Sequence, residues 1–205
     1  MIRNFSELAT DESIKVAREA LEKNGITVVV VENGQQAKAK VLEMVPAGAE
    51  IMNMSSVTVD LIGLAEELNK SGKFNSVRNK LTEMSDKKDT TFDGKKLGAA
   101  PDWTVGSVHA VTEDGKAIIA SASGSQLPSY AYGSNHVLWI VGSQKIVKDF
   151  DQGMERINEY VFPLENERAM KAYGMASSIN KVLLINKEST AGRITMIIVK
   201  EKLGF

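Results

Sequence analysis

The chain has 205 residues and a formal net charge of -1, and 43% of its residues are hydrophobic, a composition typical of an ordinary globular protein. The near-neutral charge argues against nucleic acid as the main partner, because binding to phosphates requires a basic surface. The absence of cysteine excludes a thiolate nucleophile, a disulfide framework, a cysteine-ligated zinc site and an iron–sulfur cluster held within this chain.

The histidine count and the distribution of apolar residues limit which cofactors and which cellular location we expect. The two histidines, His109 and His136, leave little for a transition-metal site, so we predict no metal and no cofactor. No apolar run approaches the roughly 20 residues of a membrane-spanning helix. The opening MIRNFSELATDE lacks the apolar core of a signal peptide. We therefore expect a cytoplasmic location and no membrane insertion.

Helical and strand patterns alternate over residues 1–70. They predict a helix closed by Asn24-Gly25, a buried strand at 26–31 and a second helix at 34–45. A short strand at 50–52 and a third helix follow. The apolar stripe of the third helix consists of Val57, Leu61, Leu64 and Leu68. This order implies a parallel sheet with crossover helices, hence an α/β fold. We expect residues 1–46 to be a helix–strand–helix part of the same compact domain as residues 47–205.

Residues 71–96 differ from the rest because they are polar and weakly periodic. A short helix around Val77, Leu81 and Met84 fits the pattern. Two interpretations stay open for this segment, a solvated linker and a lid over a site.

The block from Gly106 to Val147 is the candidate site. Its β-compatible run from Val105 to Val111 is followed by Asp114-Gly115, a strong signal for a two-residue type I′ hairpin turn. After a second strand come the polar loop 121–126 and a short helix that begins near Pro128. The apolar run 136–141 is typical of a strand buried on both faces. A polar loop between such strands is where α/β sheets usually bind ligands.

The C-terminal part is predicted to hold two helices and two strands. Pro163 is expected to stop the first helix, and Glu165 to open the second. The strands 181–186 and 194–199 are separated only by KESTAGR, a connection short enough for a hairpin. At least one sheet edge is therefore predicted to be antiparallel.

Two polar loops are candidate walls of an anion-binding site. The first, at a strand-to-helix junction, contains Asn53, Ser55, Ser56 and Thr58. Free helix N–H groups at such a junction bind anions, although a serine there can equally act only as an N-cap. The second contains Ser123, Gly124, Ser125 and Gln126. Its glycine would let the backbone approach a ligand, and the alternative is a flexible connection.

Three further residues are candidates for chemistry or binding. Glu113 ends a strand beside a polar loop and could act as a base or nucleophile; the alternative is a solvated carboxylate. His109 lies an even number of residues away, so on a regular strand it shares a face with Glu113; the alternative is a structural histidine. Arg193 could clamp an anion with two hydrogen bonds, or be an ordinary turn arginine.

Several segments together resemble one known family. GSVHAVTEDG, SASGSQ, VLWIVGSQKIV, ERINEYVFPLENERA, GRITMIIVKEKLGF and the junction NMSSVTVDLIGL are similar, in order and spacing, to the LUD-domain family. This is the lactate-utilization group to which lactate utilization protein C belongs. The resemblance covers roughly residues 47–205.

The resemblance implies a fold and a role. The fold would be similar to that of sugar-phosphate isomerase and CoA-transferase-like proteins, a mostly parallel sheet flanked by helices with antiparallel edge strands. The role would lie in oxidation of L-lactate to pyruvate, alongside iron–sulfur partner proteins. The family offers no well-defined catalytic residue to carry over.

These observations leave three hypotheses for function. The first is an accessory protein of a lactate-utilization type system that binds a small anionic metabolite. The second is an independent CoA-transferase-like or phosphosugar-isomerase-like enzyme that uses Glu113. The third is a protein–protein interaction module, for example a homodimer joined through an edge strand.

Overall fold

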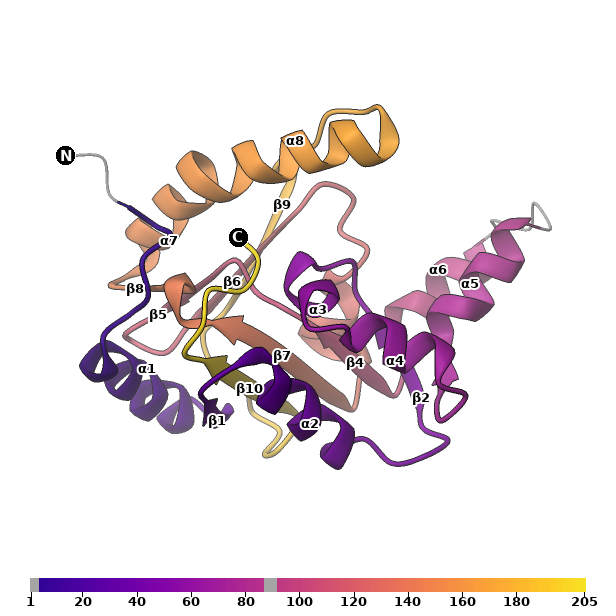
Figure 1. Cartoon of the computed structure of the whole chain (residues 1–205), viewed down its shortest axis with the longest axis horizontal. Coiled ribbons are helices and arrows are strands. Elements are labelled where there is room, and N and C mark those ends of the chain that lie inside the picture. Colours follow the sequence, from indigo (N-terminus) through magenta and orange to yellow (C-terminus); the bar gives the residue numbers. More distant parts are fainter. Residues whose placement is uncertain (1–3, 87–91) are drawn as a thin grey trace.

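The computed structural model describes residues 4–86 and 92–205 and contains a large parallel sheet and a smaller mixed sheet (Figure 1). The large sheet consists of β1 (Thr27–Val31), β10 (Ile194–Val199), β7 (His136–Gly142), β4 (Trp103–Gly106), β2 (Glu50–Asn53) and β3 (Asn75–Ser76), in that spatial order. All neighbouring pairs in it are parallel. The smaller sheet consists of β8 (Ile146–Val147), β5 (Ala110–Thr112), β6 (Ala117–Ser121) and β9 (Lys181–Ile185). The predicted α/β fold class is confirmed.

Helices cover both faces of the large sheet. On one face lie α2 (Gly34–Met44), α3 (Val57–Leu61) and α4 (Leu64–Lys70), which share an apolar core with Leu138 and Ile140 of β7. On the other face, α1 (Asp11–Lys23), α5 (Val77–Asp86) and the smaller sheet share a core with Trp139. Alternate residues of β7 therefore enter opposite cores, as expected for a strand buried on both sides.

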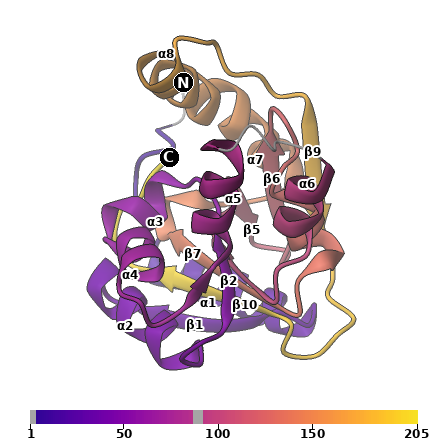
Figure 2. The same ribbon diagram turned by 90° about the vertical axis from the view of Figure 1, so that its right-hand side faces the viewer.

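A long helical run covers the outer face of the smaller sheet (Figures 1 and 2). It comprises α7 (Phe150–Arg156), the π-helical turn η3 (Ile157–Val161) and α8 (Phe162–Tyr173). The predicted helix stop at Pro163 is wrong. The proline lies in the first turn of α8, where its missing N–H costs little because the widened π turn precedes it.

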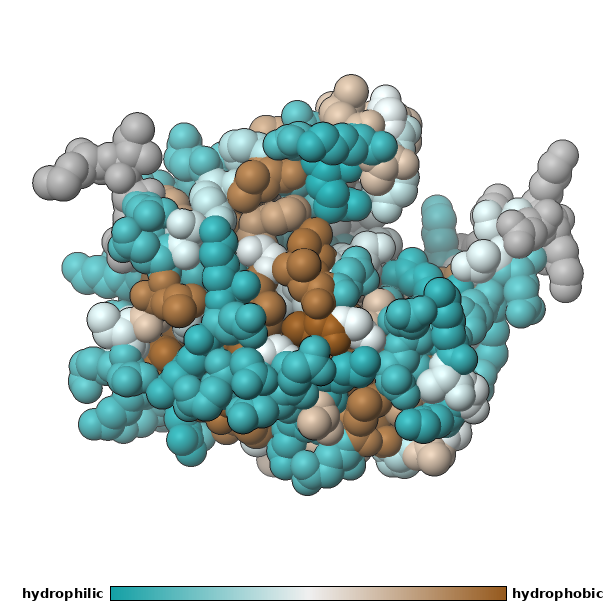
Figure 3. Space-filling view, in the orientation of Figure 1, coloured by the Kyte–Doolittle hydropathy of each residue, from teal (hydrophilic) through white to brown (hydrophobic). Residues whose placement is uncertain are grey.

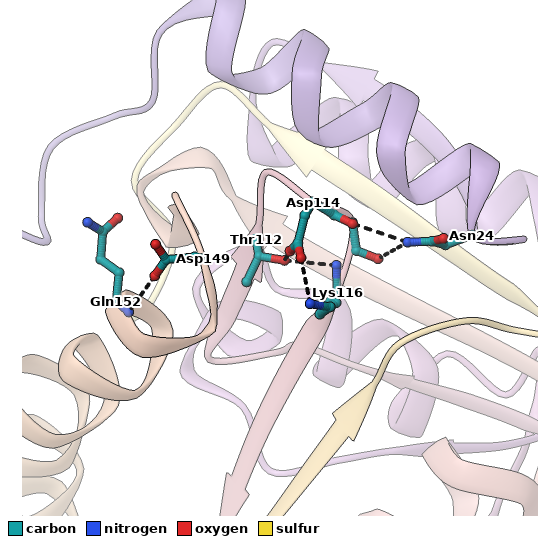
Figure 4. Close-up of polar contacts among 7 residues, drawn as sticks. Asn24, Thr112, Asp114, Lys116, Asp149 and Gln152 are labelled. Carbon is teal, nitrogen blue, oxygen red and sulfur yellow. Dashed lines mark hydrogen bonds and ion pairs between the residues drawn. The ribbon is translucent and has the colours of Figure 1, made fainter.

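The predicted hairpin is confirmed, but its loop has three residues rather than two. Thr112 N–H donates to Lys116 O across the loop, and Gly115 adopts φ +82°. This is the pattern of a type I turn followed by a left-handed residue. The Asn24 side chain, at the end of α1, donates to Asp114 O and Gly115 O at 3.2 and 2.9 Å (Figure 4). Asp114 is therefore explained by its place in the turn.

The predicted strand from Val105 to Val111 is divided between the two sheets. β4 ends at Gly106 in the large sheet, and β5 begins at Ala110 in the smaller one. A Cβ at position 106 would collide with the Tyr130 hydroxyl, so only glycine fits there. Residues 107–109 therefore cross from one sheet to the other, and this crossing forms one wall of the site described below.

The hairpin predicted around KESTAGR is also wrong. β9 pairs antiparallel with β6 at the edge of the smaller sheet, whereas β10 lies between β1 and β7 in the large sheet. All six residues of β10 are buried, a pattern that requires neighbours on both sides. The antiparallel sheet edge is present, but β6 rather than β10 supplies the partner.

The third predicted helix is interrupted. α3 ends at Leu61 and α4 begins at Leu64, because Gly63 adopts the left-handed conformation with φ +65°. Replacing Gly63 by alanine is expected to lower the free energy of unfolding by about 1–2 kcal/mol, since a side chain strains this backbone conformation. Urea denaturation measures the change.

Gly98, inside α6 (Phe92–Ala99), is the matched control for this prediction. A Cβ there would make only an ordinary 3.5 Å contact with Leu81, and no positive φ is involved. Gly98→Ala should leave stability unchanged or raise it by up to about 1 kcal/mol. Equal destabilisation by both substitutions would contradict the conformational explanation.

The segment 71–96 contains two helices, α5 and α6, which project from the body of the molecule (Figures 1 and 2). The helix expected around Val77 is confirmed as α5. Part of this segment, residues 87–91, lies outside the described residues. The choice between a linker and a lid stays open.

The surface viewed in Figure 3 is mostly hydrophilic, with a band of hydrophobic residues that runs from α8 across the middle of the face. Within residues 4–86 and 92–205, no helix has both the length and the apolar character needed to cross a bilayer.

Candidate functional site

A polar cavity of about 350 Å³ lies where β2, β4 and β7 end. Asn53 is the last residue of β2, Ser107 follows β4, and Lys145 ends the 3₁₀ turn η2 (Ser143–Lys145) that follows β7. The carboxyl ends of parallel strands meet at one edge of a sheet, which is where open α/β sheets bind ligands. We call this space the polar cavity.

Lys145 is the most unusual residue of the polar cavity because its side chain is 2% exposed. Its Nζ lies 3.0 Å from Thr58 Oγ1, 3.1 Å from Ser107 Oγ and 3.3 Å from Val108 O. No ion pair joins it to a carboxylate of residues 4–86 or 92–205. Burial, followed by the charge of Arg156, holds the pKa of Lys145 well below its usual range.

His109 lines the same cavity from the crossing between the two sheets. The Ala120 N–H donates to His109 Nδ1 at 3.1 Å, so the proton of the neutral imidazole sits on Nε2. Burial lowers the pKa of His109 to about 3, and the charge of Arg156 acts in the same direction. The ring is therefore a neutral hydrogen-bond donor at neutral pH.

Arg78, in α5, brings a cation to the polar cavity. Its Nη2 donates to Asn53 O at 2.7 Å. Burial lowers the pKa of Arg78, with Tyr173 and Asp60 opposing, but a guanidinium remains charged at neutral pH. The side-chain oxygen Asn53 Oδ1 is buried and accepts no hydrogen bond from residues 4–86 or 92–205. Arg78 is thus a charged donor at the cavity, and Asn53, which also lines it, keeps an unused acceptor that is buried.

Other charges at the cavity are largely balanced. Arg168 donates to both carboxylate oxygens of Glu165 at 2.7 Å, and this bidentate pair neutralises itself. Burial raises the pKa of Asp60, which Arg168 and Arg78 oppose. Arg78 therefore supplies the cationic group best placed to bind an added anion.

The first predicted wall reaches the cavity, but its residues differ in role. Ser55 and Ser56 both line it. Ser56 Oγ also accepts from Val59 N at 3.5 Å, so it caps α3 as the alternative interpretation proposed. Thr58 is buried; its hydroxyl donates to Leu203 O and accepts from Lys145, so it positions the lysine.

The second predicted wall lies next to the first. Ser123, Gly124, Ser125 and Gln126 line an adjoining cavity of about 650 Å³, which also contains Ser55 and Arg78. Ser55 and three of these loop residues line a third space of about 250 Å³ with His109. The two loops thus converge, although the strands that precede them, β2 and β6, lie in different sheets.

Comparison with known proteins identifies the family. The family model for the LUD domain matches residues 14–204. The chain belongs to the LUD domain family. No curated protein matches its sequence.

This LUD domain is also similar to a crystal structure described as a DUF162 family protein from Deinococcus radiodurans. The TM-score is 0.55 and the sequence identity 11%, over 94% of this chain and 99% of that chain. At this identity the similarity shows a shared fold.

Two predicted residues lie outside the polar cavity of this LUD domain. The Glu113 carboxylate accepts a hydrogen bond from the Ser13 hydroxyl of α1. Arg193 directly precedes β10 and forms a buried ion pair with Glu188 at 2.7 Å. The structure therefore brings neither of them together with the two polar loops.

Among the cavity residues that sequence reasoning missed are Arg78, Ser107 and Lys145. Arg78 lies in the segment whose role was left open. Lys145 did carry a signal, because it lies in a short polar turn, SQK, between the apolar run 136–141 and the buried strand β8. A lysine is almost never fully buried without a reason, so such a position deserves a test of function.

Proposed function

We propose that this LUD domain binds a small carboxylate metabolite in the polar cavity and serves as the ligand-binding component of a lactate-utilization type system. The observation that carries the proposal is Arg78, a cation at the cavity that makes no ion pair with a carboxylate of residues 4–86 or 92–205. Arginine is suited to binding a carboxylate, since its planar group offers parallel N–H donors.

The neighbouring groups favour a 2-hydroxy acid. Asn53 Oδ1 is an unused buried acceptor, and a small movement of its side chain would let it accept a hydrogen bond from an α-hydroxyl group while Arg78 holds the carboxylate. Ser55 adds a hydroxyl at the same place. A site that hydrogen-bonds a substrate hydroxyl discriminates against an analogue that lacks it. L-lactate should therefore bind more tightly than pyruvate.

In this proposal the chain supplies no electrons. It has no cysteine with which to hold an iron–sulfur cluster, so electron transfer would fall to separate iron–sulfur proteins. The chain would bind or present the metabolite to them.

Arg78→Gln is expected to abolish stabilisation by L-lactate, because the substitution removes the charged partner of the carboxylate. At about a hundred times its dissociation constant, a ligand raises the free energy of unfolding by roughly 2.7 kcal/mol. For a chain of this length that is a rise of roughly 5–11 °C in the unfolding temperature. Thermal-shift measurement with L-lactate and pyruvate tests both the loss and the order of affinity.

Arg18→Gln is the matched control, because Arg18 pairs with Glu22 on the exposed side of α1, at 50% side-chain exposure. This variant should keep the full shift. An Arg78→Gln protein that L-lactate stabilises as well as wild type would refute the site.

The alternative enzyme hypothesis depended on Glu113 as nucleophile or base. That carboxylate bonds to Ser13 and is not among the residues that line the polar cavity. No observation now favours a CoA-transferase-like or phosphosugar-isomerase-like reaction through this residue.

A further inference from the structure

Three oxygens surround Lys145 Nζ, and two of them can only accept a hydrogen bond from it. Val108 O, a carbonyl, can only accept from Nζ. Thr58 Oγ1 donates its own proton to Leu203 O at 3.2 Å, so towards Nζ it too must accept. A neutral amine has two N–H groups and one lone pair. The Ser107 hydroxyl donates to Val108 O over a long 3.4 Å, and its oxygen lies 3.1 Å from Nζ. Rotation of this hydroxyl towards Nζ lets it donate to the lone pair, while the two N–H groups satisfy Val108 and Thr58.

The surroundings favour the neutral amine. Lys145 is 2% exposed and forms no ion pair with a carboxylate of the described residues, whereas the Arg156 cation is a close charged neighbour. An isolated buried charge is costly, and a lysine in such a place gives up its proton instead. The lowered pKa of Lys145 agrees with this assignment.

We propose that Ser107 and Lys145 form a nucleophile–base pair for acyl transfer, with a carboxylic ester or thioester as the substrate class. Serine is a weak nucleophile by itself and becomes reactive when a base accepts its proton, and lysine serves as that base in some hydrolases. Ser107 is partly exposed and lines the polar cavity, so an acyl group can reach it.

The reaction balances with water as the co-substrate. Ser107 Oγ attacks the carbonyl carbon, and its proton passes to Lys145 Nζ. The bond to the alcohol or thiol leaving group breaks, and the leaving group takes that proton from Nζ. Water then attacks the acyl-serine, gives a proton to Nζ, and releases the acid as Ser107 Oγ regains its proton.

His109 supplies a donor for the oxyanion of such a reaction. Its Nδ1 is occupied by the Ala120 N–H, so the Nε2–H is the group available at the cavity. A neutral imidazole in this state donates a hydrogen bond but does not transfer its proton. Such a pre-oriented donor stabilises the negative charge that develops on the carbonyl oxygen of the substrate. Ser107, His109 and Lys145 thus give the nucleophile, the oxyanion donor and the base.

This proposal does not rest on the binding of lactate. It concerns covalent reactivity of Ser107, whereas the proposed function concerns reversible binding through Arg78. The two can therefore fail separately, although both use the polar cavity.

A fluorophosphonate probe and intact-protein mass spectrometry test the pair. Wild type should gain one phosphonyl group, which peptide mapping should place on Ser107. Ser107→Ala should gain none. Ser189→Ala, an exposed serine in the loop between β9 and β10, should label like wild type. Equal labelling of wild type and Ser107→Ala would overturn the proposal, as would no labelling of wild type.

Lys145→Met tests the base separately from the nucleophile. Removal of a general base should slow labelling of Ser107 by about 100-fold or more. A second measurement needs no variant. The labelling rate of wild type should rise with pH as Lys145 loses its proton and then reach a plateau. Because the pKa of Lys145 is lowered, this plateau should be reached before about pH 10, where an ordinary lysine loses its proton. A wild-type rate that keeps rising with hydroxide concentration above this pH, or Lys145→Met labelled at the wild-type rate, would overturn the proposal.

Discussion

Replacing Arg193 by methionine is expected to lower the free energy of unfolding by about 3–5 kcal/mol, because it leaves the Glu188 carboxylate buried without its partner. The two side chains are 9% and 8% exposed, and Arg193 Nε and Nη2 both lie 2.7 Å from Glu188 Oε2. Arg193 Nη1 also donates to Ser134 O at 3.0 Å, and Nη2 to Tyr130 O at 2.8 Å. The substitution thus also removes the hydrogen bonds that hold the start of β10 to the π-helical turn η1 (Ser129–Gly133) and the residue after it.

At roughly 2–4 °C per kcal/mol for this chain length, the loss corresponds to a fall of about 6–20 °C in the unfolding temperature. Urea denaturation at neutral pH gives the free energy directly. Arg168→Met is the control, since its ion pair with Glu165 is about a third exposed, 33% and 31%, and exposed pairs contribute about 0–1 kcal/mol. If Arg193→Met is no less stable than Arg168→Met, the structural role assigned to Arg193 is wrong.

Local signals predicted many of the elements correctly. The apolar runs at β7 and β10 are strong because strands buried on both faces alternate little. The run at β1 also forms a strand, but at the edge of the large sheet, where only Val28 is buried. Helix starts were equally clear: Thr10 caps α1 and Asn33 caps α2, each through its side chain. In such places short-range chemistry alone decides the conformation.

The errors arose where distant contacts decide. The sequence near Val105 and Val111 reads as a single strand, yet its two halves enter different sheets, where β4 pairs with β2 and β7 and β5 pairs with β6 and β8. The strands β9 and β10 likewise separate because β10 must lie between β1 and β7. Pairing of this kind depends on residues far apart in the chain, which a local pattern does not contain.

Sequence patterns pointed to some residues of the polar cavity, but not to those on which its proposed chemistry depends. Parallel strands bring the carboxyl ends of β2, β4 and β7 together, which fits the place of Ser55. Ser123 follows β6 of the smaller sheet, so its approach to Ser55 depends on how the two sheets pack. The spacing argument for Glu113 assumed a regular strand through His109, whereas β5 spans only Ala110–Thr112. The role of Lys145 depends on oxygens from three separate segments, and only the folded chain assembles them.

Acidification should destabilise the protein well above the pH at which carboxylates titrate, because His109 is held neutral in the folded state. The folded pKa of His109 is about 3, against 6.5 for the ordinary side chain. Between these values the unfolded chain binds a proton that the folded chain does not, so the free energy of unfolding falls as pH falls. From pH 7.5 to 5.0 the loss attributable to His109 is about 2 kcal/mol.

His109→Asn isolates this contribution. The asparagine side-chain oxygen can accept the same Ala120 N–H, but the residue does not titrate. Urea denaturation at pH 7.5 and 5.0 should therefore show a loss about 2 kcal/mol smaller for the variant than for wild type. The groups that face His109, Lys145 and Arg156, are the same in both proteins, so they do not produce the difference. An identical pH dependence would mean that His109 becomes protonated without unfolding, and the neutral Nε2–H donor assigned to the cavity would then be wrong.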